Sequence, residues 1–165
     1  MARRSSAPGL EPARGFRAFM DAHCEIIIAR PRATIAAMMF DPAKAHLWSS
    51  GVSACRPLGP GPIRAGSRVE QVSRVFGLRT VAVYEVVSLE PDRFLEIRLP
   101  GPFDTWCLHE LEDCAAGTLV RIRTKAVGGD PGFFRNFGAL LRMMTRYNLR
   151  RDLRKLKRVV EALPI

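Results

Sequence analysis

The sequence predicts an α+β fold in which a curved antiparallel sheet wraps around one long C-terminal helix, with two short helices after the first strand. Two observations carry this prediction. Five segments of alternating apolar and polar residues follow one another between residues 67 and 127, separated by short turns, which is typical of an antiparallel meander. Residues 133–163 then carry one broad apolar stripe with helical spacing, and Gly138 is the only helix breaker in it. Only this helix is long enough to cover the apolar face of the sheet.

The chain before the meander is expected to form one strand and two short helices. Residues 24–29 are a β-branched run, which favours a strand. Pro31 can begin a helix at its first turn, where the missing N–H does no harm, and residues 34–40 are apolar with helical spacing. The Asp-Pro step at 41–42 is typical of a helix N-cap, so a second short helix is expected to run to Trp48.

Glycine and proline positions set the boundaries of the meander. Residues 49–66 are rich in Gly and Pro and cannot form long regular elements, although a weak strand is expected at 52–56. Further turns are expected where Gly, Pro or Asp interrupts the alternation. The strands expected between these turns are residues 67–75, 78–89, 94–99, 104–112 and 118–127.

Composition indicates one folded domain. The chain has 165 residues, of which 47% are hydrophobic and 25% charged, as in ordinary globular proteins, and this length can enclose a sizeable core. Residues 1–18 are rich in Arg, Pro and Ser without an apolar period, so they are expected to be a disordered tail before a single domain at 19–165. No apolar run approaches the roughly 20 residues of a membrane span. The first residues also lack the apolar core of a signal peptide, so a cytoplasmic location is the expectation.

A net charge of +10, supplied mostly by Arg, allows an acidic partner such as nucleic acid, anionic lipid or an anionic ligand. Arg in place of Lys is also typical of a GC-rich genome, in which case the charge carries no functional content. Basic residues gather on the C-terminal helix, where an anionic lipid or another acidic partner could bind, although a solvated helix face is the commoner explanation. They are Arg135, Arg142, Arg146, Arg150, Arg151, Arg154, Lys155, Lys157 and Arg158.

Cysteine and histidine spacing gives no metal or redox motif. Cys24, Cys55, Cys107 and Cys114 contain no Cys-x-x-Cys pair, so free thiols are expected. The three histidines lie far apart and lack a ligand-spaced acidic or cysteine partner. The sequence also contains no phosphate-loop, dinucleotide-binding, Gly-x-Ser-x-Gly or His-Glu-x-x-His motif. No metal and no cofactor is therefore expected.

Four polar side chains fall on inward-facing positions of the expected strands: Gln71, Ser73, Tyr84 and His109. Buried polar groups need partners. These residues therefore either orient a ligand in an apolar cavity or bond one another and trapped water. His109 could act as a general acid or base, although a hydrogen-bonded core histidine is the commoner case.

Several short segments resemble the SRPBCC superfamily in their order and spacing, and together they span about residues 20 to 160. The matching segments are Ala-Arg-Pro-Arg at 29–32, Phe-Asp-Pro at 40–42 with Trp48, Gly-Ser-Arg-Val at 66–69, Tyr-Glu-Val-Val-Ser-Leu-Glu-Pro at 84–91, His-Glu-Leu-Glu at 109–112, Gly-Thr-Leu-Val at 117–120 and the helix end at 149–157. This superfamily includes START domains, plant pathogenesis-related proteins of the birch-pollen-allergen type, aromatic polyketide cyclases and ubiquinone-binding proteins. The resemblance implies a helix-grip fold around a hydrophobic pocket, but it does not imply one chemistry.

The leading hypothesis is that the domain binds or transports a hydrophobic small molecule, such as a lipid, quinone, polyketide or other aromatic, in an internal cavity. Burial of apolar surface would supply most of the affinity, and the four inward polar residues would set the orientation. The long helix would supply the opposite wall. The expected ligand-binding residues are Val69, Gln71, Ser73, Ala82, Tyr84, Ile97, Cys107, His109, Ile122, Phe137, Leu140, Leu141 and Met144.

The residues also fit two alternative functions. An enzyme resembling the aromatic polyketide cyclases and dehydratases would use the same cavity, with His109 and Tyr84 as candidate catalytic residues for proton transfer. A more distant alternative is a nucleic-acid-binding or ribosome-associated regulator that acts through the basic helix, although this helix lacks the interleaved aromatic residues of single-strand binders. Both a monomer and a homodimer are compatible with the sequence.

Overall fold

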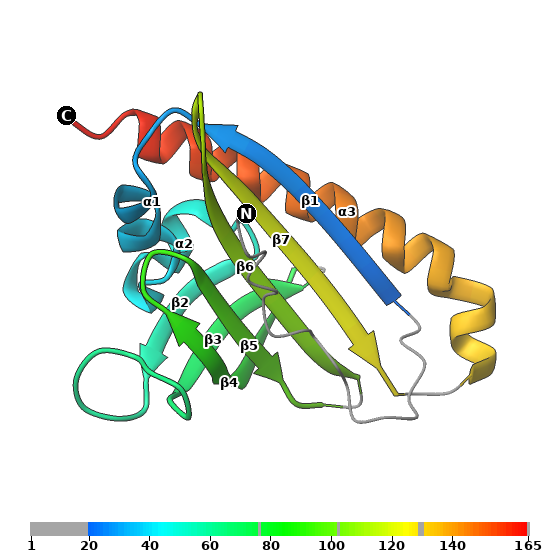
Figure 1. Cartoon of the computed structure of the whole chain (residues 1–165). Helices are drawn as coiled ribbons and strands as arrows, with labels where there is room; N and C mark the ends of the chain where they lie inside the picture. The colour runs from blue at the N-terminus through cyan, green and yellow to red at the C-terminus, as the bar shows by residue number, and fades with distance from the viewer. Residues whose placement is uncertain (1–19, 76, 102, 129–130, 165) are drawn as a thin grey trace, which may run out of the picture.

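The computed structural model describes residues 20–75, 77–101, 103–128 and 131–164. It shows one seven-stranded antiparallel sheet, in the order β1-β7-β6-β5-β4-β3-β2, which curves around the long helix α3 (Figure 1). The predicted α+β helix-grip fold is confirmed, and the predicted tail at 1–18 lies outside the described residues. The elements are β1 (Met20–Ile28), α1 (Arg32–Met39), the 3-10 turn η1 (Pro42–Lys44), α2 (Ala45–Trp48), β2 (Val52–Pro57), β3 (Arg68–Val75), β4 (Leu78–Glu90), β5 (Phe94–Leu99), β6 (Asp104–Cys114), β7 (Gly117–Val127) and α3 (Pro131–Glu161).

The first strand is longer than predicted and begins at Met20 instead of residue 24. Met20, Ala22 and Cys24 are buried, while His23 between them is exposed. This alternation is the strand period of two. Polar residues at every second position hide it from a search for continuous β-branched runs.

The first two strands lie at opposite edges of the sheet, so the chain between them must cross from one edge to the other. At one edge, β1 pairs with β7 from Met20 opposite Ala126 to Ile28 opposite Thr118. The crossing consists of α1, η1 and α2. It contains the predicted Asp-Pro helix start, because Asp41 Oδ1 accepts a hydrogen bond from the Ala43 backbone N–H at 3.0 Å.

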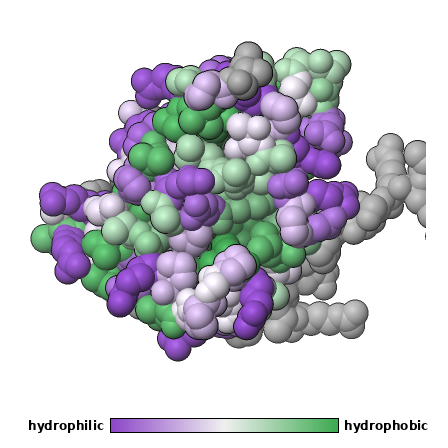
Figure 2. All heavy atoms as spheres, turned by 90° about the vertical axis from the view of Figure 1, so that its left-hand side faces the viewer, coloured by the Kyte–Doolittle hydropathy of each residue, from purple (hydrophilic) through white to green (hydrophobic). Residues whose placement is uncertain are grey.

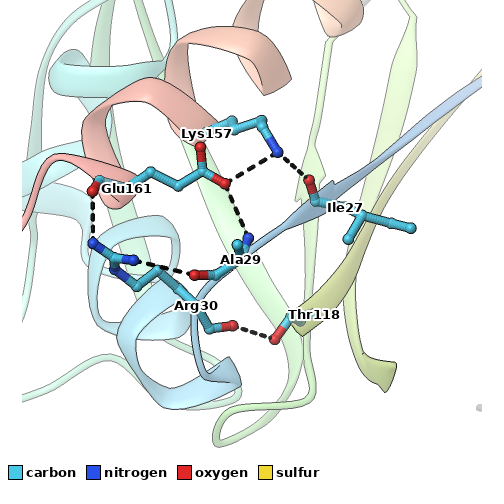
Figure 3. Close-up of polar contacts among 6 residues, drawn as sticks. All are labelled: Ile27, Ala29, Arg30, Thr118, Lys157 and Glu161. Atoms are coloured by element: carbon cyan, nitrogen blue, oxygen red, sulfur yellow. Dashed lines mark hydrogen bonds and ion pairs between the residues drawn. The ribbon is translucent and has the colours of Figure 1, made fainter. Parts of the chain in front are cut away.

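The C-terminal end of α3 is held to the junction between β1 and α1 by a set of polar contacts (Figure 3). Arg30 donates from Nη2 to the backbone carbonyl oxygens of Glu161 at 2.6 Å and Leu163 at 3.1 Å. The Glu161 carboxylate accepts from the backbone N–H of Ala29 and from Lys157 Nζ, both at 3.0 Å. The bonds from Arg30 satisfy carbonyl groups that a helix end leaves unpaired, and together these contacts fix the helix to the sheet edge.

The two halves of α3 are buried to very different extents. In the C-terminal half, Leu153, Leu156 and Val160 are fully buried in the core between the helix and the sheet. In the N-terminal half, Phe137 and Leu140 are each 48% exposed. The apolar stripe read from the sequence is therefore not one continuous core contact, because its N-terminal part reaches the surface.

Gly117 begins β7 at a hairpin where no side chain fits. Its φ of 127° is rarely adopted by residues with a Cβ. A Cβ here would collide with the backbone of Ile28 and Ala29. The neighbouring Thr118 donates from Oγ1 to the carbonyl oxygen of Arg30 at 2.8 Å. The hairpin before β7 and the junction after β1 therefore pack backbone against backbone.

Three further features of the structure bear on function. All four cysteines are free. Within the described residues, no helix combines the length and apolar character that crossing a bilayer requires. Those residues also contain no group of three or more His, Cys, Asp or Glu side chains that could hold a metal ion.

Candidate functional site

A cavity of about 240 Å³ lies between the inner face of the sheet, the crossing segment and the middle of α3. Strands β2 to β7 supply one wall, with Leu95 and Ile97 among its apolar residues. The crossing supplies a second wall through residues such as Phe40 and Trp48, and α3 contributes Leu149 with Asp152. The enclosure is therefore mostly apolar, with a few polar groups on the sheet and others at Asp41, Ser49 and Asp152.

Six of the predicted ligand-binding residues line this cavity, and all six come from the sheet. They are Gln71, Tyr84, Ile97, Cys107, His109 and Ile122. The period of two along each strand places them on one face. Ser73 lies beside this group, where its Oγ accepts a hydrogen bond from Gln71 Nε2 at 2.9 Å. Two of the four inward polar residues, Gln71 and Ser73, therefore already bond each other.

The predicted helix wall is displaced from the cavity. Phe137 and Leu140 are exposed, and Leu141 and Met144 are half-buried, but none of these four is among the described residues that line the cavity. The helix instead contributes residues more than one turn farther along, beginning at Leu149. The apolar stripe indicates which residues share a face, but it does not indicate which turn lies over the cavity.

Two more strand residues that were predicted to bind the ligand, Val69 and Ala82, are not among the described residues that line the cavity. Val69 is fully buried and belongs to the core, and Ala82 is half-buried on β4. A role for any of the thirteen residues in binding a ligand stays a prediction.

Sequence reasoning missed the wall that the crossing segment supplies. Trp48 lines the cavity and packs edge-to-face with His109, at 6.1 Å between ring centroids and 87° between planes. Its buried indole N–H has no hydrogen-bond partner among the described residues. Phe40 and Pro42 line the same wall. The signal was present in the sequence, because these residues belong to the segments that carry the family resemblance.

The cavity reaches the surface beside η1. Asp41 belongs to the lining, and its side chain is 39% exposed. Near this opening, Asp152 of α3 accepts hydrogen bonds from Ser49 Oγ at 3.2 Å and from the Ser50 backbone N–H at 2.9 Å. Figure 2 views the side of the molecule that carries α1 and α2, where hydrophobic side chains occupy the middle of the face and hydrophilic ones surround them.

His109 is buried and, besides Trp48, contacts Leu95 and Cys107 inside the cavity wall. Its Nδ1 lies 3.3 Å from the carbonyl oxygen of Leu95 on β5, the residue opposite it in the register. Its Nε2 lies 3.7 Å from Cys107 Sγ, two positions earlier on the same face of β6. Cys107 Sγ also lies 3.4 Å from Thr124 Oγ1 on β7. The strand register thus brings an imidazole, a thiol and a hydroxyl into one contiguous group.

The pKa values of Cys107 and His109 both shift in the direction that favours the charged form of each group. Burial alone raises the pKa of Cys107, but the attraction of His109 and hydrogen bonds from His109 and Thr124 outweigh it, and the net pKa is lowered. Burial alone lowers the pKa of His109, but the attraction of Cys107, its hydrogen bond and the bond to Leu95 outweigh it, and the net pKa is raised. Each group therefore stabilises the ionised state of the other.

Tyr84 and Cys55 line the cavity in their neutral forms. Burial, with a smaller contribution from the nearby Cys55, raises the pKa of Tyr84 well above its ordinary value. Burial also raises the pKa of Cys55 to about 11. Cys55 Sγ lies 3.9 Å from Gln71 Oε1, to which it donates. The phenol and this thiol are therefore protonated at neutral pH.

A helix-grip sheet closed over a mostly apolar cavity defines an SRPBCC-type protein. The sequence agrees, because residues 21–161 match the family described as polyketide cyclase / dehydrase and lipid transport. The chain belongs to this family, which confirms the resemblance to the SRPBCC superfamily. A search of curated proteins finds no match.

Solved structures with the same fold come from varied proteins. TTHA0849 from Thermus thermophilus is 16% identical, with a TM-score of 0.72, and the alignment covers 86% of this chain and 97% of that one. Ara h 8.0201 is 10% identical, with a TM-score of 0.65, and coverage is 90% and 100%. The di-domain ARO/CYC BexL from the BE-7585A biosynthetic pathway is 19% identical, with a TM-score of 0.68, and coverage is 86% and 46%. These likenesses show a shared fold.

Proposed function

We propose that the cavity binds a compact, mostly apolar molecule of about aromatic size that carries an oxygen atom. The observation that carries this proposal is the cavity itself, about 240 Å³ in volume and walled mainly by apolar side chains. Small-molecule sites usually measure about 300–1,000 Å³, so a ligand at the small end of that range fits best. This size favours a single-ring or fused-ring aromatic, a quinone head or a short polyketide over a long-chain lipid.

Polar groups on opposite walls would orient such a ligand. On the sheet, the neutral hydroxyl of Tyr84 can donate or accept a hydrogen bond. On the crossing segment, the indole N–H of Trp48 lacks an acceptor among the described residues. A ligand oxygen placed beside that N–H would offset the cost of burying an unsatisfied donor. The ligand class proposed is therefore apolar with a carbonyl or hydroxyl oxygen.

Binding of the neutral fluorescent probe N-phenyl-1-naphthylamine tests the apolar, ring-sized character of the cavity, and native mass spectrometry of co-purifying molecules tests for an oxygen-containing ligand. The probe should bind one site per chain. Ile97→Trp, which fills the cavity, should weaken binding at least about tenfold, or about 1.4 kcal/mol. Ile27→Trp is the matched control, because Ile27 is exposed on β1. Absence of binding, or equal binding by both variants, would contradict the proposal.

Enzymatic use of the same cavity, as a cyclase or dehydratase, is the second candidate. Family membership supports it, and so does the position of two titratable groups, Tyr84 and His109, on one cavity wall. Cyclisation of a poly-β-keto thioester would need a bent substrate and proton transfer. His109→Gln and Tyr84→Phe should each slow it about 10²–10⁴-fold. Turnover that is unchanged in both variants would remove these residues from the mechanism.

An anionic membrane surface is the partner proposed for the outward face of α3. Leu140, Met143 and Tyr147 follow one another on this face at helical spacing and are 48%, 62% and 65% exposed. The face continues into a shallow hollow lined mainly by basic side chains. None of the described residues that line this hollow is acidic. These lining residues are Tyr147, Arg150, Arg151, Arg154, Lys157 and Arg158. Anionic headgroups complement the arginines, and the apolar row fits the boundary of the acyl chains.

Cosedimentation with vesicles tests this surface. The protein should bind phosphatidylcholine vesicles only when phosphatidylglycerol is included, and added salt should weaken the binding. Arg151→Glu with Arg154→Glu should abolish it, whereas Arg74→Glu with Arg79→Glu, the same charge change at two exposed positions on β3 and β4, should have a smaller effect. Binding to neutral vesicles alone, or to RNA but not to vesicles, would overturn the membrane proposal.

A further inference from the structure

The hydrogen-bond partners of His109 fix which of its nitrogens carries the proton. The carbonyl oxygen of Leu95 can only accept, so Nδ1 donates to it across 3.3 Å. In the neutral ring, Nε2 therefore presents a lone pair toward Cys107 Sγ at 3.7 Å. The backbone thus holds the imidazole in the tautomer that can accept the proton of the thiol.

Proton transfer from Cys107 to His109 would leave a thiolate that keeps hydrogen-bond donors. The imidazolium would donate from Nε2, and the Thr124 hydroxyl, 3.4 Å from the sulfur, is placed to donate as well. Buried charges are tolerated when they are paired in this way. A thiolate beside an imidazolium is the arrangement that activates sulfur nucleophiles.

The sulfur faces a cavity that can hold an electrophile. Cys107, His109 and Thr124 all line the enclosure, and Cys107 is partly exposed there, so a molecule in the cavity can reach the sulfur. Cys55 lines the same enclosure without an imidazole partner, and its raised pKa keeps it a neutral thiol. The molecule thus contains two cavity cysteines that differ mainly in the neighbouring base.

We propose that Cys107 and His109 form a nucleophilic pair that adds covalently to an α,β-unsaturated carbonyl compound held in the cavity. The thiol proton passes to Nε2, and the sulfur forms a bond to the β-carbon while the carbon–carbon π bond breaks. The electron pair of that bond moves to the enolate, which takes the proton back from Nε2 at its α-carbon. The product is a neutral thioether, and neither an oxidant nor a reductant is needed. This inference rests on the proposed binding of an apolar, oxygen-containing molecule in the same cavity.

Site-resolved labelling with cyclohex-2-en-1-one tests the inference on the intact wild-type chain. At pH 7 Cys107 should carry the larger thiolate fraction, because His109 stabilises its thiolate, whereas burial raises the pKa of Cys55 to about 11. The lower nucleophilicity of the less basic thiolate offsets only part of this advantage. Peptide mass spectrometry should therefore show Cys107 labelled on the order of tenfold faster than Cys55. Labelling of Cys55 at an equal or higher rate would overturn the inference.

His109→Gln, with a control variant outside the cavity, tests the role of the imidazole. His109→Gln should slow Cys107 labelling on the order of tenfold at pH 7 and move its rise with pH upward, because the thiolate loses its partner. An unchanged rate and pH profile in a folded His109→Gln protein would contradict the inference. Cys114→Ser, a change outside the described lining of the cavity, should leave both N-phenyl-1-naphthylamine binding and Cys107 labelling unchanged. Probe binding without selective labelling would reject the nucleophilic pair alone, whereas loss of probe binding in the wild type would reject the proposed function as well.

Discussion

The N-terminal and C-terminal halves of α3 carry the same apolar spacing but serve different surfaces. In the C-terminal half, Leu153, Leu156 and Val160 are buried, and the helix end is held by Arg30 and Glu161 (Figure 3). In the N-terminal half, Leu140 and Met143 are exposed. Figure 1 shows why, because the N-terminal end of α3 extends past the start of β1. An apolar helix face is therefore core only where a second layer lies against it.

A pair of leucine truncations should separate the two halves most clearly. Leu156→Ala removes a fully buried side chain, so the free energy of unfolding should fall by about 2–5 kcal/mol. Leu140→Ala removes an exposed one and should change it by no more than about 0.5 kcal/mol. Urea denaturation followed by circular dichroism measures both. Equal effects would contradict the assignment of the two halves.

Loss of the polar contacts at the C-terminal end of α3 should give the next largest difference in unfolding free energy between a pair of variants. Arg30→Ala removes two bonds to terminal carbonyl groups of α3, so the unfolding free energy should fall by about 1–3 kcal/mol. Hydrogen exchange in the last turn of α3 should also become faster. Arg135→Ala makes the same change at an exposed position in the N-terminal half and should leave both quantities nearly unchanged.

Position along α3 should also decide which substitutions block the cavity. Leu149→Trp projects a larger side chain into the cavity and should weaken N-phenyl-1-naphthylamine binding about tenfold, or about 1.4 kcal/mol. Met144→Trp lies more than one turn away and should retain binding. A fluorescence titration distinguishes the two, and the reverse order would place the cavity under the N-terminal half.

The smallest effect expected is a pH response at the C-terminal end. The bond from the Ala29 backbone N–H, followed by the bond from Lys157, lowers the pKa of Glu161. A lowered pKa means that this contact stabilises the fold above the ordinary glutamate range and is lost as pH falls through the lowered value. The protection factor of the Ala29 amide should therefore fall below pH about 4, and Glu161→Gln should weaken this dependence. NMR-detected exchange measures it, and a pH-independent Ala29 protection would argue against the contact.

Most of the sheet could be predicted because its signal is local. The segment at 94–99 coincides with β5 (Phe94–Leu99), and the segment at 78–89 differs from β4 (Leu78–Glu90) by one residue. Period two and turn residues are properties of neighbouring positions, so a single sequence displays them. The start of β1 was missed where polar residues alternate with buried ones.

The cavity could be predicted only on its sheet side. Strand parity selects Tyr84, Cys107 and His109 correctly, because every second residue faces inward. It does not report which turn of a helix lies opposite, so Leu149 was missed. Pairing of Cys107 with Thr124 likewise depends on the register between β6 and β7, which no local pattern specifies.

The pairing of β1 with β7 also sets an order for folding. Among the described residues, β1 is the first strand, and the one strand that pairs with it is β7, the last. Contacts so distant in sequence form slowly, because a long loop must close before they are made. During synthesis, β1 must therefore leave the ribosome well before its partner exists, with its backbone groups open to other chains. A chain that stops before Gly117 would keep that edge open and should aggregate.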